Sequence, residues 1–448
     1  MVGGEHSSSG ERDRERFRRA RLVAGANVAA HGMQVLSQLL VVPIALSYLG
    51  TERFGLWMAL LSIVAIAAFA DFGLGAGLQN AIAECVGRGD RSGPRRFLSS
   101  AFFMLVGLAV LLVYMAIWLL PSLPLLQWLN VRGETARQEV LPACQALLIC
   151  IAIGLPAGLV TRVYNGFQEG YVPKMWIAAG RLLALGGVLL CVSYGFGLPW
   201  MAAVYTGAPF ILLALGGHAL LWKRPWLVPS LSVVDRVAIA RITGTGIPAF
   251  AVQISLVLAT SGIPLIIAAQ FGAEALPPFA VTQRFLWLPT MMVGVLVYPL
   301  WPAYREALAR GDRAFLRAGW QRSLKQAALI QLPFVGMMLL WGQDIILFWT
   351  GEAEVVPDPS LLYALCAWSS LTTFSMVCMI LLFGWERFAG QAVYALLTAL
   401  AALVTCYYQA ASWGPSGIAW GLVLICGLPR ALFYGLEVWV QMRRLRAE

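Results

Sequence analysis

Twelve runs of apolar residues occupy almost the whole chain, and each is long enough to cross a bilayer as a helix. A helix needs roughly 20 apolar residues to cross a hydrocarbon core about 30 Å thick. The runs lie near residues 22–48, 54–77, 97–120, 139–161, 175–195, 198–222, 238–270, 275–302, 321–347, 359–384, 390–411 and 415–441. With 60% hydrophobic and 12% charged residues, the composition lies outside the range of soluble domains. The sequence therefore predicts an all-α integral membrane protein with twelve transmembrane helices.

Residues 49–90 align without a gap on residues 271–312, at a constant offset of 222 positions. The informative identities are polar or glycine residues at the two ends, because apolar matches arise easily by chance between membrane helices. They are Gly50/Gly272, Glu52/Glu274, Glu84/Glu306, Arg88/Arg310, Gly89/Gly311 and Asp90/Asp312. Each copy contains a Gly/Glu turn, a long apolar helix and an RGD turn. An offset near half of the 448 residues predicts two six-helix bundles related by internal duplication.

The net charge of +10 follows from where the Lys and Arg residues are placed. Of the 32, 26 fall in the two termini and in alternate loops, all on one side of a twelve-helix topology. The positive-inside rule places that side, and both termini, in the cytoplasm. The predicted parts are a basic cytoplasmic tail (1–21), an N-terminal six-helix bundle (22–222), a cytoplasmic linker (223–237), a C-terminal six-helix bundle (238–442) and a cytoplasmic tail (443–448).

The sequence offers little for catalysis or for metal binding. The eight cysteines have no CxxC spacing and the three histidines are scattered, so we expect neither disulfides nor a metal site. The polar stretches between helices are short, and they contain no phosphate-binding or nucleophile motif. Because the basic residues are explained by topology, no nucleic-acid partner is expected. We expect a protein that is not an enzyme and has no cofactor.

Polar residues inside the apolar runs carry the remaining functional signal, because each costs free energy in lipid. Asn27, His31, Gln34 and Gln38 are spaced four, three and four residues apart, so they share one stripe of the first helix. The repeat equivalent of His31 is Gln253. One interpretation is that the first and seventh helices line a shared hydrophilic cleft that binds substrate. The other is that these side chains form hydrogen bonds between helices.

Four of the charged residues that fall within apolar runs are candidates for function. Asp71, in the sequence DFGLGAG, is a candidate for binding a coupling proton or sodium ion, or for pairing with an arginine such as Arg181. Arg284 lies about 10 Å into the eighth helix at 1.5 Å per residue. Its planar guanidinium suits a diphosphate or an acidic sugar, and pairing with a helix carboxylate is the alternative. Arg181 and Arg430 are further candidates, the first near enough to the interface to extend toward water.

The stretch YLGTERFGLWMALLSIVAIAAFADFGLGAG followed by GRGD, the second turn FGAEA with ARGD, and the twelve-helix layout resemble the bacterial polysaccharide flippases. These flippases belong to the multidrug/oligosaccharidyl-lipid/polysaccharide exporter superfamily, and the resemblance covers the chain from about residue 20. It implies two bundles facing a central cleft that opens alternately to either side. It also implies a polyprenyl-diphosphate-linked oligosaccharide as substrate, moved to the outer leaflet for O-antigen (lipopolysaccharide), capsule or exopolysaccharide synthesis.

The resemblance further implies that basic residues in the cleft meet the anionic substrate, with Arg284 the first candidate and Arg181 and Arg430 behind it. The implied partners are the lipid-linked glycan, the lipid bilayer, a polysaccharide polymerase and other assembly proteins. The implied location is the bacterial cytoplasmic (inner) membrane. Two alternatives remain, a small-molecule or drug antiporter of the same superfamily and a membrane glycan-processing enzyme. Exporters of lipophilic cations are expected to carry deep carboxylates, whereas the deep charges here are chiefly arginine.

Overall fold

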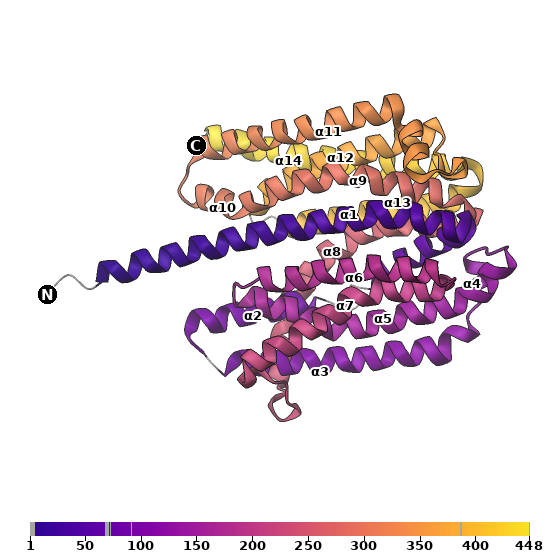
Figure 1. Ribbon diagram of the computed structural model, residues 1–448. Helices are drawn as coiled ribbons and strands as arrows, with labels where there is room; N and C mark the ends of the chain where they lie inside the picture. The colour runs from indigo at the N-terminus through magenta and orange to yellow at the C-terminus, as the bar shows by residue number, and fades with distance from the viewer. Residues whose placement is uncertain (1–4, 68–70, 72, 91, 386–387, 448) are drawn as a thin grey trace. The chain divides into compact units, whose positions relative to one another are not determined.

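The computed structural model describes residues 5–67, 71, 73–90, 92–385 and 388–447 (Figure 1). Within these ranges, the side chains of residues 5–31, 67, 245–253, 256, 302, 303, 306, 309, 384, 388, 389, 392 and 445–447 lie outside the description. All regular structure in these ranges is helical. The prediction of an all-α protein is confirmed.

The long helices account for the predicted membrane crossings. They are α1 (Glu5–Ala67), α2 (Leu74–Arg88), α3 (Gly93–Tyr114), α5 (Glu134–Gly166), α6 (Tyr171–Ser193), α7 (Leu198–Lys223), α8 (Arg236–Phe271), α9 (Pro277–Val297), α11 (Arg313–Thr350), α12 (Pro359–Gly384), α13 (Phe388–Gly421) and α14 (Leu428–Ala447), with short α4 (Leu125–Trp128) and α10 (Trp301–Ala309). Among the described residues, nine helical segments are long and apolar enough to cross a membrane. Kinks at Gly50 and Gly414 divide two of the nine into two crossings each, and α8 adds one more. Twelve crossings result, as the apolar runs predict.

The Gly/Glu turns of the two repeats have the same backbone geometry. Gly50 has φ 74° and ψ 171°, and its repeat equivalent Gly272 has φ 97° and ψ 161°. Positive φ is costly for residues with a Cβ, so a glycine is required at both places. In each repeat a glutamate follows two residues later, at Glu52 and Glu274. The duplication predicted from the sequence is therefore visible in the backbone itself.

The RGD turns also match, and their chemistry explains why glycine and aspartate are paired. Gly89 (φ 71°) and Gly311 (φ 69°) both adopt the left-handed conformation that ends a helix. The aspartate after each glycine then caps the next helix: Asp90 Oδ1 accepts from the backbone N–H of Gly93 at 3.0 Å, and Asp312 Oδ1 accepts from Phe315 N–H at 2.9 Å. One short motif thus ends one helix and starts another in both repeats.

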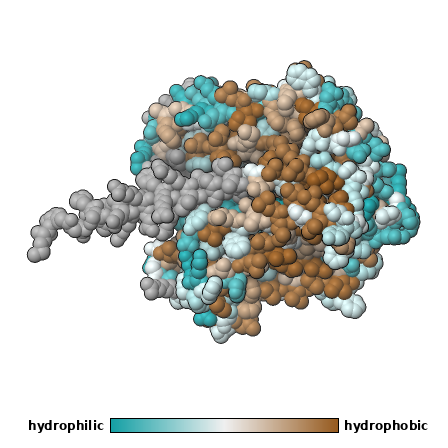
Figure 2. Space-filling view, viewed as in Figure 1, coloured by the Kyte–Doolittle hydropathy of each residue, from teal (hydrophilic) through white to brown (hydrophobic). Residues whose placement is uncertain are grey.

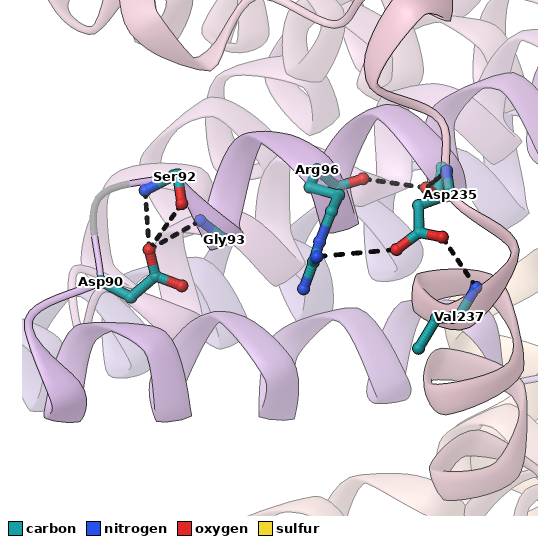
Figure 3. Close-up of polar contacts among 7 residues, drawn as sticks. Asp90, Ser92, Gly93, Arg96, Asp235 and Val237 are labelled. Carbon is teal, nitrogen blue, oxygen red and sulfur yellow. Dashed lines mark hydrogen bonds and ion pairs between the residues drawn. The ribbon is translucent and has the colours of Figure 1, made fainter.

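The cap at α3 predicts a pH-dependent contribution to stability. Hydrogen bonds from the Gly93 N–H, the Ser92 hydroxyl and the Ser92 N–H hold the pKa of Asp90 below its ordinary value (Figure 3). The stabilisation is therefore present above the unfolded pKa of about 3.9 and is lost as the pH falls through the folded pKa. We expect Asp90→Ala to lower the melting temperature of purified protein at pH 6. The difference from wild type should shrink below about pH 4; a constant difference across that range would contradict the capping role.

Contacts within the chain define two compact units, which we describe separately. The first contains the described residues within Met1–Val41, Ala70–Leu123 and Leu141–Ala249, and the second those within Val42–Phe69, Pro124–Val140 and Phe250–Glu448. The bundle limits 22–222 and 238–442, and the linker and tails around them, stay predictions from the sequence.

Small residues bring helices of the first unit close together. A Cβ on Gly180 of α6 would meet the Pro209 backbone of α7 at 2.5 Å, and one on Gly216 of α7 would meet the Trp176 ring at 2.7 Å. Small residues at such contacts are typical of membrane helices, because lipid provides no hydrophobic driving force and close van der Waals packing must replace it. Close packing at these glycines therefore helps to hold α6 against α7.

In the second unit, α9, α10, α11, α12 and α14 share an apolar core. Val293, Leu381 and Val438 are buried in it, together with the whole side chain of Tyr304. The Tyr304 hydroxyl finds a partner in Ser323 Oγ at 2.9 Å, which satisfies a polar group that would otherwise be stranded in an apolar interior.

The two Gly/Glu turns of the second unit are each contacted by a loop from the other repeat. Arg132, in the loop before α5, pairs with Glu274 at 3.0 Å. Glu354, in the loop before α12, accepts a hydrogen bond from the Thr51 hydroxyl at 3.0 Å. The Arg132 N–H also donates to Glu52 at 2.8 Å. Both turns are therefore fixed by contacts from residues far away in the sequence.

The surface agrees with a bilayer environment. Large apolar side chains face outward along α11, where Leu329, Leu340 and Phe348 are 74%, 71% and 92% exposed. Figure 2 shows hydrophobic surface over the middle of the helices and hydrophilic surface toward their ends. In water such exposure would be costly, whereas hydrocarbon is the natural neighbour of these side chains.

Candidate functional site

The predicted polar stripe of α1 is only partly within the described structure. Gln34 and Gln38 are half-buried on one face of α1. The side chains of Asn27, His31 and the repeat equivalent Gln253 lie outside the described residues. The assignment of this stripe to a hydrophilic cleft therefore stays a prediction.

Asp71 lies at the start of α2, where two glycines let its side chain approach the backbone. Its Oδ1 accepts from the Gly73 N–H at 3.1 Å and its Oδ2 from the Gly75 N–H at 3.3 Å. A Cβ placed on Gly75 would touch Asp71 Oδ2 and Arg162 Nε, both at 2.9 Å. Asp71 and Arg162 thus converge on the space above Gly75. This position suits an aspartate that satisfies the exposed N–H groups of a helix start.

Arg162, near the C-terminal end of α5, is a charged residue that the sequence analysis did not single out. It was placed in a loop because the apolar run ends near residue 161, but α5 continues to Gly166. Asn165, on the same last turn, donates to Gln79 of α2 at 3.3 Å. The signal that could have shown the longer helix is the polar turn after Gly166, where Gln168 takes a positive φ of 60°.

The role of Asp71 can be tested by an isosteric change. Because Asp71 accepts two backbone hydrogen bonds, Asp71→Ala should lower the free energy of unfolding by about 1 kcal/mol, the usual cost of losing a cap. Asp71→Asn keeps one acceptor, so it should lose less and should retain transport. Both can be measured by thermal unfolding and by transport at matched protein level. A stable Asp71→Asn protein with no transport would instead support the predicted role in binding a coupling ion.

Arg181 of α6 forms no ion pair with Asp71 within the described residues. Its guanidinium lies over the Tyr205 ring of α7, 5.7 Å from the centroid. A cation over an aromatic face is stabilised by the ring quadrupole. Arg181 is half-buried. Its extension toward the membrane interface and its role as a substrate-binding residue stay predictions from the sequence.

Arg284 and Arg430 both belong to the second unit but have different surroundings. Arg284 is half-buried on α9, next to Phe285, which packs on Phe334 and Trp349. Arg430 of α14 is only 9% exposed, and its Nη2 donates to the Ala395 carbonyl at 3.0 Å. Within the described residues, Arg430 forms no ion pair and its Nε has no hydrogen-bond partner. The surroundings of Arg430 cost more free energy than those of Arg284, because a buried guanidinium with unused donors has lost water without gaining partners.

The α13–α14 contact around Arg430 contains further polar groups. The Tyr434 hydroxyl donates to the backbone carbonyl of Gln391 at 3.4 Å, and the Tyr394 hydroxyl donates to the backbone carbonyl of Pro429 at 3.3 Å. Gln391 is 3% exposed, and both of its amide atoms lack a partner among the described residues. Unmet donors and acceptors beside a buried arginine are what a polar ligand or water would satisfy. Gln391 was not found from the sequence, since a lone glutamine in an apolar run gives little signal.

A second polar cluster in this unit is already satisfied. Gln331 Nε2 donates to Ser369 at 2.8 Å, Thr373 donates to Gln331 Oε1 at 3.1 Å, and Thr290 lies 2.8 Å from Thr373. Since these buried groups use one another, the cluster fixes α9, α11 and α12 together without needing a ligand. It is a structural network, in contrast to the surroundings of Arg430.

Comparison with known proteins shows the class of this fold. No protein-family model matches the chain, and no curated protein matches it in sequence. Solved structures do match over almost the whole length. An inward-facing MATE family multidrug resistance transporter of the MOP superfamily has a TM-score of 0.76 at 19% identity, covering 92% of this chain and 96% of the other.

Two further structures extend this likeness. An outward-facing MATE family transporter gives a TM-score of 0.67 at 19% identity, with 95% and 96% of the two chains covered. A MOP superfamily transporter from Pyrococcus furiosus Vc1 gives 0.65 at 18% identity, with 96% of each chain covered. The chain therefore has the twelve-helix, two-lobe fold of these transporters, and the fold class predicted from the sequence is confirmed.

Proposed function

We propose that the protein moves polyprenyl-diphosphate-linked oligosaccharide from the inner to the outer leaflet of the bacterial cytoplasmic membrane, by alternating access, for polysaccharide export. The diphosphate and the sugars of such a substrate cannot cross about 30 Å of hydrocarbon unaided, whereas its polyprenyl tail is soluble there. A protein with a transporter fold and cationic side chains within the membrane would give the headgroup the polar contacts that hydrocarbon does not provide.

The sign of the intramembrane charges is the observation that carries this proposal. Arg162, Arg181, Arg284 and Arg430 lie within membrane-spanning helices, and Arg430 is buried without an ion pair among the described residues. The acidic candidate is Asp71, whose oxygens are already used by backbone N–H groups. Guanidinium groups recognise phosphate oxygens by bidentate hydrogen bonds. An anionic substrate is therefore favoured over a lipophilic cation.

The alternative is a small-molecule antiporter, since the structural neighbours include multidrug resistance transporters. The Pyrococcus furiosus protein is described as having a binding pocket of reverse polarity that suggests a different function. The arginines in the helices of this chain likewise favour a substrate other than a cationic drug. Deleting the gene and measuring three quantities separates the two functions: surface polysaccharide, lipid-linked oligosaccharide in the membrane, and sensitivity to cationic drugs.

We expect the deletion strain to lose surface polysaccharide and to accumulate the lipid-linked oligosaccharide facing the cytoplasm, with drug sensitivity unchanged. Expression of the intact chain should reverse both changes. Increased drug sensitivity with normal polysaccharide would overturn the proposal in favour of the antiporter.

The proposed orientation in the membrane can be tested with topology reporters. A reporter fused at Glu354, in the acidic loop before α12, should report the outer side, because that loop has no Lys or Arg. Reporters fused after Gly311 and at Glu448 should report the cytoplasm. Finding Glu354 and Glu448 on the same side would exclude a twelve-helix topology with both termini inside.

A further inference from the structure

The first unit contains an apolar groove that the proposed transport does not use. Its cavity volume is about 660 Å³, and it lies between α3, α5 and α7. Apart from His218, its lining side chains are apolar, among them Phe102, Val110, Ile153 and Leu221. Ile153 and Val110 are also 47% and 65% exposed, so the groove is open at the surface of the unit.

The groove is long enough for a hydrocarbon chain. On α3 its lining runs from Leu98 to Val113 along one face of the helix. At 1.5 Å per residue these fifteen steps span about 22 Å. One leaflet of a bilayer contributes about 15 Å of hydrocarbon, half of a core about 30 Å thick. A lipid acyl chain lying along α3 would therefore remain in the groove across the full thickness of one leaflet.

One end of the groove is closed by the segment that follows α7. Pro229 lines the groove there. The Ser230 N–H donates to Ser99 Oγ at 3.1 Å, and the Asp235 N–H donates to Ser100 Oγ at 3.2 Å. Asp235 also pairs with Arg96 at 3.6 Å and caps its own helix by accepting from Val237 N–H at 3.0 Å (Figure 3). The segment is thus fixed onto the first turns of α3.

Two cations close in sequence to the lining residues at this end, Arg95 and Lys223, form no ion pair with carboxylates of the described residues. Arg95 donates through Nε to the Val228 carbonyl at 3.1 Å, a bond that does not use its terminal NH₂ groups. Lys223 is exposed at the end of α7, two residues after Leu221 of the lining. Neither forms an ion pair in the described part of the chain, whereas Arg96 and Arg224 do so with Asp235 and Glu169.

We infer that the groove binds an anionic membrane phospholipid, with an acyl chain along α3 and its phosphate at Arg95 and Lys223. The apolar lining selects hydrocarbon, and the two free cations at the closed end select a negative headgroup. Basic pockets between membrane helices on the cytoplasmic side bind anionic headgroups in this manner. The proposal concerns a resident lipid and does not depend on the transported substrate.

The experiment uses the purified full chain and a phosphatidylglycerol carrying a photoreactive group in its acyl chain. We expect crosslinks in peptides of α3, α5 and α7. Excess phosphatidylglycerol should compete for this labelling, and phosphatidylcholine should compete about tenfold less well, the ratio that about 1.4 kcal/mol of headgroup interaction gives. Crosslinks spread evenly over all exposed helices, or equal competition by both lipids, would overturn the proposal.

Variants then separate the tail from the headgroup. Ala109→Trp fills the groove and should abolish labelling, whereas Leu190→Trp, on the exposed face of α6, should not. Arg95→Gln with Lys223→Gln should remove the preference for phosphatidylglycerol while tail labelling persists. Retained labelling in Ala109→Trp would exclude the groove. Stronger competition by undecaprenyl phosphate than by phosphatidylglycerol would assign the groove to the transported lipid instead. If the variants do not fold, the competition experiments on the wild-type protein alone still distinguish these outcomes.

Discussion

Replacing Arg430 by glutamine should reduce polysaccharide export at least tenfold while leaving the protein as stable as wild type or more so. The guanidinium is 9% exposed and has no carboxylate partner among the described residues, so its removal strands no opposite charge. An arginine near the middle of a membrane helix costs roughly 2.5–3.5 kcal/mol on insertion scales, and glutamine removes that charge. Export should be measured as surface polysaccharide at matched protein level, with thermal unfolding in parallel.

Two further variants control this result. Arg430→Lys keeps the charge but loses the bidentate geometry, so it should restore only part of the export. Arg224→Gln breaks an ion pair with Glu169 in which both side chains are 25% exposed. It should therefore lower the free energy of unfolding by about 1–3 kcal/mol, a cost between those of breaking an exposed and a buried salt bridge. Normal export by a well-folded Arg430→Gln protein would remove Arg430 from the substrate path. A large loss of stability would show that it is paired.

Replacing Gly55 by leucine should abolish accumulation of folded protein. A Cβ at this position would come well within 3.0 Å of the Ala273 carbonyl oxygen, which is backbone and cannot turn aside. Overpacking a core costs about 1–3 kcal/mol for added methylene groups, and a backbone clash adds to that. The Gly/Glu turn around Gly272 would have to move away from α1 to make room. Yield and monodispersity after extraction measure the effect.

The matched control is Gly107→Leu, because Gly107 of α3 is also a membrane-helix glycine but a Cβ there meets no atom within 4 Å. We expect it to accumulate as wild type does. Equal yields of the two variants would show that the Gly55 contact is not required for folding.

The fold could be predicted from the sequence because its determinants are local. Long apolar runs can only be satisfied as helices in lipid, and the RGD turns combine a left-handed glycine with a capping aspartate, which short-range pattern alone identifies. The repeat was visible because glycine and polar identities at its two ends, such as Gly50/Gly272 and Asp90/Asp312, do not depend on chance apolar matches. The structure adds that Gly50 and Gly272 both have positive φ.

The candidate site was less accessible for a physical reason: burial and pairing depend on contacts between distant helices. The sequence favoured Arg284 from its depth in a helix, whereas in the described part of the chain Arg430 is buried and its Nε has no hydrogen-bond partner. Arg162 was not identified as a helix residue because the apolar run ends near residue 161, whereas α5 continues to Gly166. Gln391 could be found only after its neighbours on α14 were known.

The loops that hold the Gly/Glu turns have a consequence for the history of the chain. Arg132 of the first repeat reaches Glu274 of the second, and Glu354 of the second reaches Thr51 of the first. The two loops contact opposite turns reciprocally, which is the isologous pattern of a two-fold homodimer, in which one patch meets its own copy. A single-repeat protein would make one such contact twice. Because the two copies share one polypeptide, each can change alone, and the two contacts differ: Arg132 forms an ion pair with Glu274, whereas Glu354 accepts a hydrogen bond from the neutral hydroxyl of Thr51.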